Sequence, residues 1–177
     1  MSGEHALAFR YLDREIFPAR KTDKEAREPR HSVDLLVANN NDNMLGLAEL
    51  KIRRDKPAYF ALIQIMMLAA EFQSPAQRER VAKYYPGKGL TWPAEGPFTD
   101  LYIIVFDPPK TGKVFDPPKT GKGNYRDRSF RATSRISERL LKDAGFAQYI
   151  RRIAYLEASV ENDAMLFKKC FAFGTGL

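Results

Sequence analysis

Three charged residues interrupt two short apolar runs early in the chain, and few folds accommodate such a pattern. The runs span residues 32–38 and 44–52, and a cluster of Asn and Asp at residues 39–43 separates them. Asn and Asp favour turns because they tolerate left-handed dihedral angles and bond to their own backbone. Two apolar runs around such a cluster predict a β-hairpin.

The charged residues are Asp34 in the first run and Glu49 and Lys51 in the second. Side chains two positions apart on a strand point to the same face, so Glu49 and Lys51 share a face that Leu50 does not. A register that is symmetric about the turn can place Asp34 beside them. Two carboxylates and one ammonium group would then converge near one point.

This convergence suggests a metal site. Carboxylates within strands are costly unless they are paired or bind a metal, and two neighbouring carboxylates repel unless a cation lies between them. Oxygen ligands of this kind suit Mg²⁺, which can activate a water and polarise a phosphoryl oxygen. The alternative is a solvated strand face with a surface ion pair, which contributes little to stability.

Residues 57–72 predict a buried helix that begins at Pro57 and is apolar almost all round. Gln64 interrupts it. Burying an amide without partners costs about 2–7 kcal/mol, so Gln64 needs a partner. The carboxylates or Lys51 would provide one, and a nearby backbone carbonyl is the alternative.

Asp34, then Glu49-Leu50-Lys51 after a hairpin, then a helix carrying Gln64, resembles the PD-(D/E)XK nuclease superfamily. The resemblance covers roughly the first two-thirds of the chain, from the first helix to the strand near Leu101. It implies an α/β fold in which helices flank a small mixed β-sheet, the restriction-endonuclease-like core. The residue before Asp34 is Val33 rather than Pro, which departs from the family pattern.

The resemblance also implies roles for these residues. Asp34 and Glu49 would bind Mg²⁺ or Mn²⁺, and the backbone carbonyl of Leu50 would complete the metal shell. Lys51 would serve the attacking water, and Gln64 would orient that group.

Residues 2–17 predict an amphipathic helix that ends before Pro18. Many relatives carry a Glu in their first helix that reaches the metal. Glu4 is the candidate for this additional ligand, and Glu15 is the alternative. A Glu near a helix N-terminus also has a simpler explanation, since it interacts favourably with the helix dipole.

The formal net charge is +7 and the pI is near 9.5, which is consistent with a polyanionic partner. Arg30 ends a charged loop at residues 20–30, and Arg53, Arg54 and Lys56 follow the proposed site. These cations are candidates for binding the DNA phosphates next to the scissile one. A solvated charged loop is the alternative explanation for residues 20–30.

Residues 73–97 predict an irregular passage around a short helix at residues 75–84. Its aromatic residues lie among cations and would either stack bases or cover the edge of the core; they are Tyr84, Tyr85 and Trp92. Residues 98–106 predict a buried strand. Residues 105–113 recur without change at 114–122 and predict a long loop.

Residues 134–144 predict a helix, and residues 149–160 a strand or a helix, with the apolar run favouring a strand. A last helix is expected to begin at Asn162 or Asp163 and to end at Gly174. Altogether, 177 residues fit one domain, taken as residues 1–177.

The composition excludes several classes of protein. One cysteine, Cys170, allows no internal disulfide, and a reducing cytoplasm is the simplest expectation. Two histidines and one cysteine cannot form a structural zinc site of the usual kind. We expect no secretory signal and no membrane span.

The expected function is metal-dependent hydrolysis of DNA phosphodiester bonds, that of a Mg²⁺-dependent endodeoxyribonuclease. The alternative is a nucleic-acid-binding or protein-interaction module that keeps the fold without cleaving. A third candidate is hydrolysis of RNA or of a nucleotide. Many nucleases of this family act as homodimers, although no heptad pattern marks an interface here.

Overall fold

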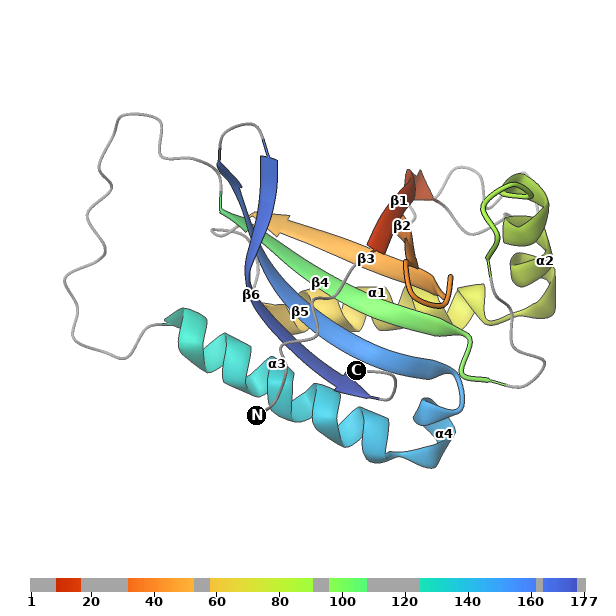
Figure 1. Cartoon of the computed structure of the whole chain (residues 1–177). Helices are drawn as coiled ribbons and strands as arrows, with labels where there is room; N and C mark the ends of the chain where they lie inside the picture. The colour runs from red at the N-terminus through yellow and green to blue at the C-terminus, as the bar shows by residue number, and fades with distance from the viewer. Residues whose placement is uncertain are drawn as a thin grey trace, which may run out of the picture.

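The computed structural model is an α/β protein with a mixed six-stranded sheet and four helices in the residues that it describes (Figure 1). The described residues are 9–16, 32–52, 58–90, 96–107, 125–161 and 164–174. The strands are β1 (Phe9–Ile16), β2 (Val33–Asn39), β3 (Leu45–Ile52), β4 (Thr99–Asp107), β5 (Ile150–Glu161) and β6 (Ala164–Gly174). The helices are α1 (Ala58–Phe72), α2 (Pro75–Tyr84), α3 (Tyr125–Lys142) and α4 (Ala144–Ala147).

The predicted hairpin is confirmed as β2 and β3. The two strands pair antiparallel from Leu35–Ala48 to Ala38–Leu45. The turn closes where the Asn39 amide donates to the Met44 carbonyl at 2.9 Å. Asn43 adopts a φ of 57°, in the left-handed region that Asn tolerates.

The strands lie in chain order across the sheet, and β3, β4 and β5 are parallel. Parallel neighbours need crossover connections, which are nearly always right-handed. Two right-handed crossovers that step in the same direction place their helices on one face. Accordingly α1 packs on β3 and β4, α3 packs on β5 and β6, and the two helices contact each other.

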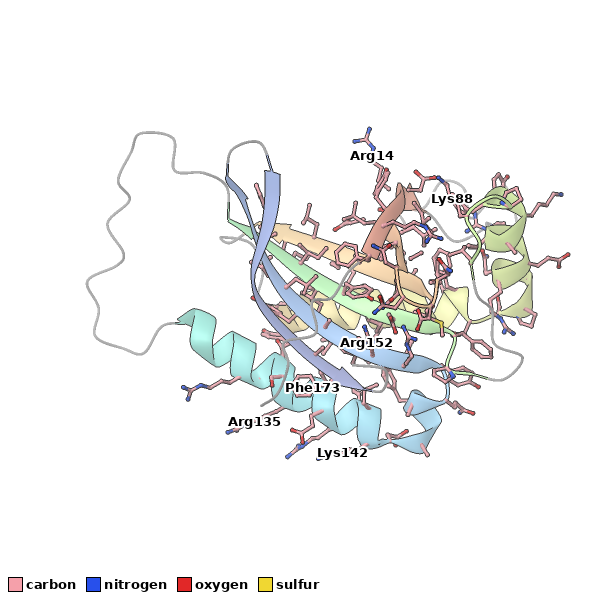
Figure 2. The ribbon with its side chains drawn as sticks, in the orientation of Figure 1. Arg14, Lys88, Arg135, Lys142, Arg152 and Phe173 are labelled. Carbon is pink, nitrogen blue, oxygen red and sulfur yellow. The ribbon has the colours of Figure 1, made fainter. Side chains whose placement is uncertain are left out.

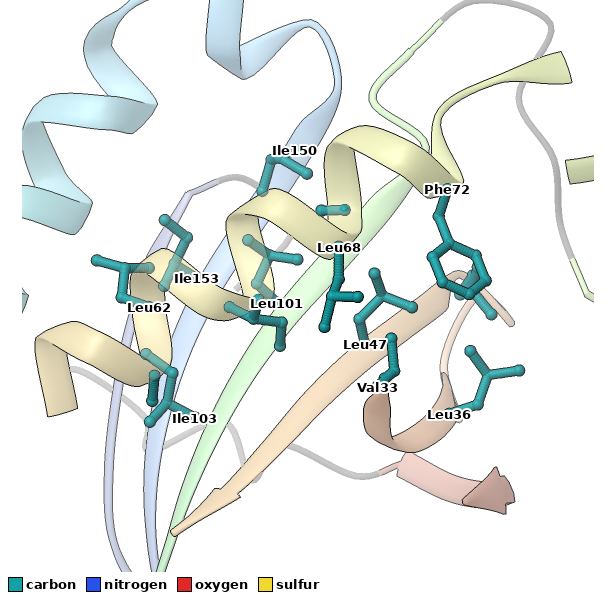
Figure 3. Close-up of a cluster of buried hydrophobic side chains, with 14 of the residues drawn as sticks. Val33, Leu36, Leu47, Leu62, Leu68, Phe72, Leu101, Ile103, Ile150 and Ile153 are labelled. Carbon is teal, nitrogen blue, oxygen red and sulfur yellow. The ribbon is translucent and has the colours of Figure 1, made fainter. Parts of the chain in front are cut away.

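The main core lies between α1 and the sheet (Figure 3). The predicted buried helix is confirmed as α1, which directs Leu62, Ile65 and Leu68 towards the strands. Leu47 and Leu101 receive these side chains. Each fully buried aliphatic side chain contributes about 1.5–3 kcal/mol, so this layer fixes α1 over the hairpin.

The prediction of an amphipathic helix at residues 2–17 is wrong for the described part, because β1 is a strand. It pairs antiparallel with β2, and the register shifts between Tyr11 and Asp13. This bulge brings Leu12 into the core. The apolar spacing fitted a helix, but the open edge of β2 supplies backbone partners that only a strand can use.

The prediction of a last helix is also wrong, because β6 pairs antiparallel with β5. A short apolar run does not distinguish a strand from a buried helix by its periodicity. The strand favoured at residues 149–160 is confirmed as β5, and the helix at 75–84 and the strand at 98–106 are confirmed as α2 and β4.

The helix predicted at residues 134–144 exists, but α3 begins earlier, at Tyr125. Most of the tandem repeat, residues 108–122, lies outside the described residues. Among the described helices, none combines the length and hydropathy that crossing a membrane requires.

Gly46 offers a test of this packing. A Cβ atom there would come within 2.5 Å of Tyr102 Cε2 and 2.7 Å of Val37 Cγ2. We therefore expect Gly46→Ala to lower the free energy of unfolding by about 1–3 kcal/mol, because overpacking forces its neighbours to move. Urea denaturation measures this. Gly87→Ala is the control, since nothing lies within 4 Å of a Cβ added there. Equal stabilities of the two variants would contradict the close packing of Gly46 against Tyr102 and Val37.

Candidate functional site

Asp34 lies where β2 and β3 stop pairing. The described ladder between these strands ends at Leu35–Ala48. One residue further, the Asp34 carboxylate takes the place of a backbone partner, since its Oδ2 accepts a hydrogen bond of 2.8 Å from the Leu50 amide. The carboxylate is thereby fixed against the second strand of the hairpin.

Glu49 is the most buried acidic residue of this group, with 1% of its surface exposed. Its neighbour across the sheet is Ile103 of β4. One carboxylate oxygen, Oε1, accepts a hydrogen bond of 2.5 Å from Lys51 Nζ. The other, Oε2, has no hydrogen-bond partner among the described residues. A buried polar atom without a partner is costly and calls for an explanation.

Lys51 links the strand to the helix. Besides Glu49, its Nζ approaches Oε1 of Gln64 at 3.5 Å, the outer limit of a hydrogen bond. Gln64 lies half-buried on α1, so the helix that covers β3 also contacts the ammonium group. The structure thus brings Asp34, Glu49, Lys51 and Gln64 together.

Burial raises the pKa of the Glu49 carboxyl above its ordinary value of 4.5. The negative charge of Asp34 raises it further, and the hydrogen bond and charge of Lys51 oppose the increase. Glu49 therefore holds a proton more readily than a solvated glutamate does. A cation placed between the two carboxylates would remove this tendency.

The donor set fits a hard divalent cation. It comprises the carboxylates of Asp34 and Glu49, including the unpartnered Oε2. In a strand, the N–H and C=O of one residue lie at the same edge, so the Leu50 carbonyl faces the side on which Asp34 binds the Leu50 amide. Mg²⁺ accepts one or two carboxylates together with waters. Within the described ranges no three His, Cys, Asp or Glu side chains gather at one point.

Of the other predicted site residues, only the alternative ligand Glu15 lies in the described part of the chain. Glu4, Arg30, Arg53, Arg54 and Lys56 lie outside the described residues. Glu15, the alternative to Glu4, belongs to β1. Its backbone lies beside that of Asp34, because the Arg14–Leu35 and Ile16–Val33 pairs flank it. The roles of these residues stay predictions.

The sequence analysis missed a polar cluster at the start of β4 and β5. Arg151 donates to both carboxylate oxygens of Asp100, through Nε at 2.8 Å and Nη2 at 2.5 Å, and it also pairs with Asp42 of the hairpin turn. A register shift after the Thr99–Ile150 pair leaves Arg151 as the extra residue of a bulge. The signal in the sequence was Asp100, a lone carboxylate at the start of an apolar strand.

Comparison of the chain with models of known families, with curated proteins and with solved structures finds no match.

The raised pKa of Glu49 predicts a pH dependence of stability in the metal-free protein. Between pH 4.5 and the raised pKa the folded state binds more protons than the unfolded state, so stability falls as the pH rises through this window. Glu49→Gln should remove this contribution. Urea denaturation of both proteins between pH 4 and 8, in EDTA, measures the difference; parallel curves would show that Glu49 titrates normally.

Proposed function

We propose that this protein is a metal-dependent nuclease that hydrolyses phosphodiester bonds of DNA, on a restriction-endonuclease-like core. One observation carries the proposal: a carboxylate of 1% exposure with an unpartnered oxygen lies beside a second carboxylate and an ammonium group. The fold is consistent with such a core, because the hairpin and the following helix supply the four proposed site residues. The basic net charge of +7 suits a polyanionic substrate.

A simple ion pair explains the cluster less well. Lys142 and Glu138 on α3 form an ordinary surface pair, with side chains 72% and 50% exposed. Such pairs contribute about 0–1 kcal/mol. Glu49 instead bears the cost of burial next to another negative charge, which a purely structural pair does not require. A functional cation accounts for this cost.

The proposed roles follow from the contacts. Asp34 and Glu49 would hold the divalent ion, with the Leu50 carbonyl as a further donor. A bound Mg²⁺ or Mn²⁺ would supply Lewis-acid polarisation of the phosphate and a water of lowered pKa. Lys51, held by Glu49 and Gln64, can hydrogen-bond the attacking water and stabilise negative charge that develops on the phosphate. Gln64 keeps the ammonium group in place.

Cleavage assays test the proposal. We expect Mg²⁺- or Mn²⁺-dependent cutting of supercoiled or single-stranded DNA, and a loss of about 10²–10³-fold in rate for Lys51→Ala, a magnitude typical of removing a group that stabilises developing charge. Asp34→Asn and Glu49→Gln should abolish the metal-dependent cutting, because these residues would hold the ion. Lys83→Ala is the control, because Lys83 is an exposed cation on α2.

If DNA binds without metal-dependent cutting, and Lys51→Ala changes nothing, the protein is a binding module rather than a nuclease.

A further inference from the structure

The outward face of α1 is apolar although it faces solvent. Phe60, Ile63 and Met67 are 43%, 51% and 58% exposed and lie along one side of the helix. The ring of Phe60 packs against Tyr59, with ring centroids 4.3 Å apart. All of α1 up to Glu71 lacks a charged residue. Exposed apolar patches of this kind mark sites of interaction.

A row of arginines lies on the neighbouring helix. Arg131, Arg135 and Arg139 recur every four residues on α3 and are exposed, so they form a row about 12 Å long. Figure 2 shows Arg135 projecting from α3 away from the sheet. The opposite side of the helix is buried, at Thr133 and Ser137.

The two features belong to one surface, because α1 and α3 are in contact. Ser134 lines a small cavity together with Phe173 of β6, so that flank of α3 faces β6. Ile136 lies on the other flank, towards α1, and is itself exposed. We call Phe60, Ile63, Met67, Ile136 and the three arginines the α1–α3 surface.

This surface lies next to the candidate site. Phe60 and Gln64 are four residues apart on α1 and are therefore neighbours on the helix. Three residues are neighbours across β3, β4 and β5: Glu49, Ile103 and Tyr155. Thr133 of α3 lines a small cavity with the last two. α3 therefore passes over the sheet about two strand spacings, or roughly 10 Å, to one side of Glu49, and the arginine row lies on the outer side of that helix.

We propose that the α1–α3 surface binds single-stranded DNA, with a base stacked on Phe60 and phosphates on Arg131, Arg135 and Arg139. The choice of polymer rests on the proposed function of the neighbouring site. Unpaired bases stack on aromatic side chains, and a cationic groove follows their backbone. A duplex presents mainly phosphates to a flat surface, which an apolar stripe cannot bind. An interfacial membrane helix needs a free apolar face beneath its cations, whereas the apolar side of α3 packs on the core.

Fluorescence anisotropy in EDTA, with a labelled 20-nucleotide oligo(dT) and a duplex of equal length, tests the proposal without cleavage. Phe60→Ala should weaken single-strand binding about 5- to 150-fold, which is the loss of one stacked base, and change duplex binding less than twofold. Phe60→Leu should weaken single-strand binding similarly, because an aliphatic side chain cannot stack. Circular dichroism checks that each variant is folded.

The phosphate contacts of the three arginines are tested by the salt dependence of binding. The variant R131Q/R135Q/R139Q should reduce the slope of log affinity against log salt by about 2, from three phosphate contacts. The control R14Q/K83Q/K88Q removes the same charge from exposed residues elsewhere; Figure 2 shows Arg14 and Lys88 on the side of the molecule away from Arg135. It should change the slope by less than half as much.

Three results would overturn the proposal. They are unchanged single-strand binding in Phe60→Ala and in R131Q/R135Q/R139Q, equal weakening of duplex and single-strand binding by Phe60→Ala, and equal salt slopes for the two triple variants. If sedimentation shows a dimer that Phe60→Ala dissociates, the surface binds a second copy of the chain. If Phe60→Ala loses binding to phosphatidylserine vesicles but keeps binding to DNA, the surface binds a membrane. The proposed function can fail separately. Phe60-dependent binding without any metal-dependent cleavage would refute the nuclease alone, and cleavage that is unaffected by these variants would refute this surface alone.

Discussion

The buried carboxylate of Glu49 is the constraint that the rest of the candidate site has to satisfy. A charge with 1% exposure is unstable unless its surroundings compensate it. Lys51 compensates one oxygen from the same strand, while Asp34 adds a second negative charge and so works against the folded state. Two carboxylates and one ammonium group leave more acidic than basic side chains around the buried Glu49. A divalent cation is the simplest group that would balance this difference.

The fold places these groups with few elements. Hairpin register sets Asp34 beside β3, and the first crossover lays α1 over Glu49 so that Gln64 meets Lys51. The parallel neighbour β4 supports β3 from its other edge. At the opposite end of the sheet, Arg151 ties the hairpin turn to β4 and β5 through Asp42 and Asp100. The hairpin is therefore held at both ends, which fixes the carboxylates in space.

Local signals were sufficient for the elements that build the candidate site. The Asn and Asp turn and the alternation of Glu49, Leu50 and Lys51 predicted the hairpin and the shared face, and the nearly continuous apolar character of α1 predicted a buried helix. The two outermost strands were missed for different reasons. β1 is a strand because it pairs with β2, although its apolar spacing fits a helix. β6 forms a hairpin with β5, but its apolar run has no periodicity that distinguishes a strand from a buried helix. The Arg151–Asp100 pair was missed because the arginine is oriented by a bulge that depends on the register of β4 and β5. Sequence reasoning thus recovered the elements that carry a clear local signal and missed those whose conformation is decided by strand pairing.

The most direct test of a cation between Asp34 and Glu49 is a crystal structure with Mn²⁺, examined by anomalous scattering. We expect one strong anomalous peak, from an ion bonded to carboxylate oxygens of both residues, and we expect it to disappear in crystals of Glu49→Gln. The absence of a peak there at saturating Mn²⁺, or an ion bound only elsewhere, would contradict this expectation.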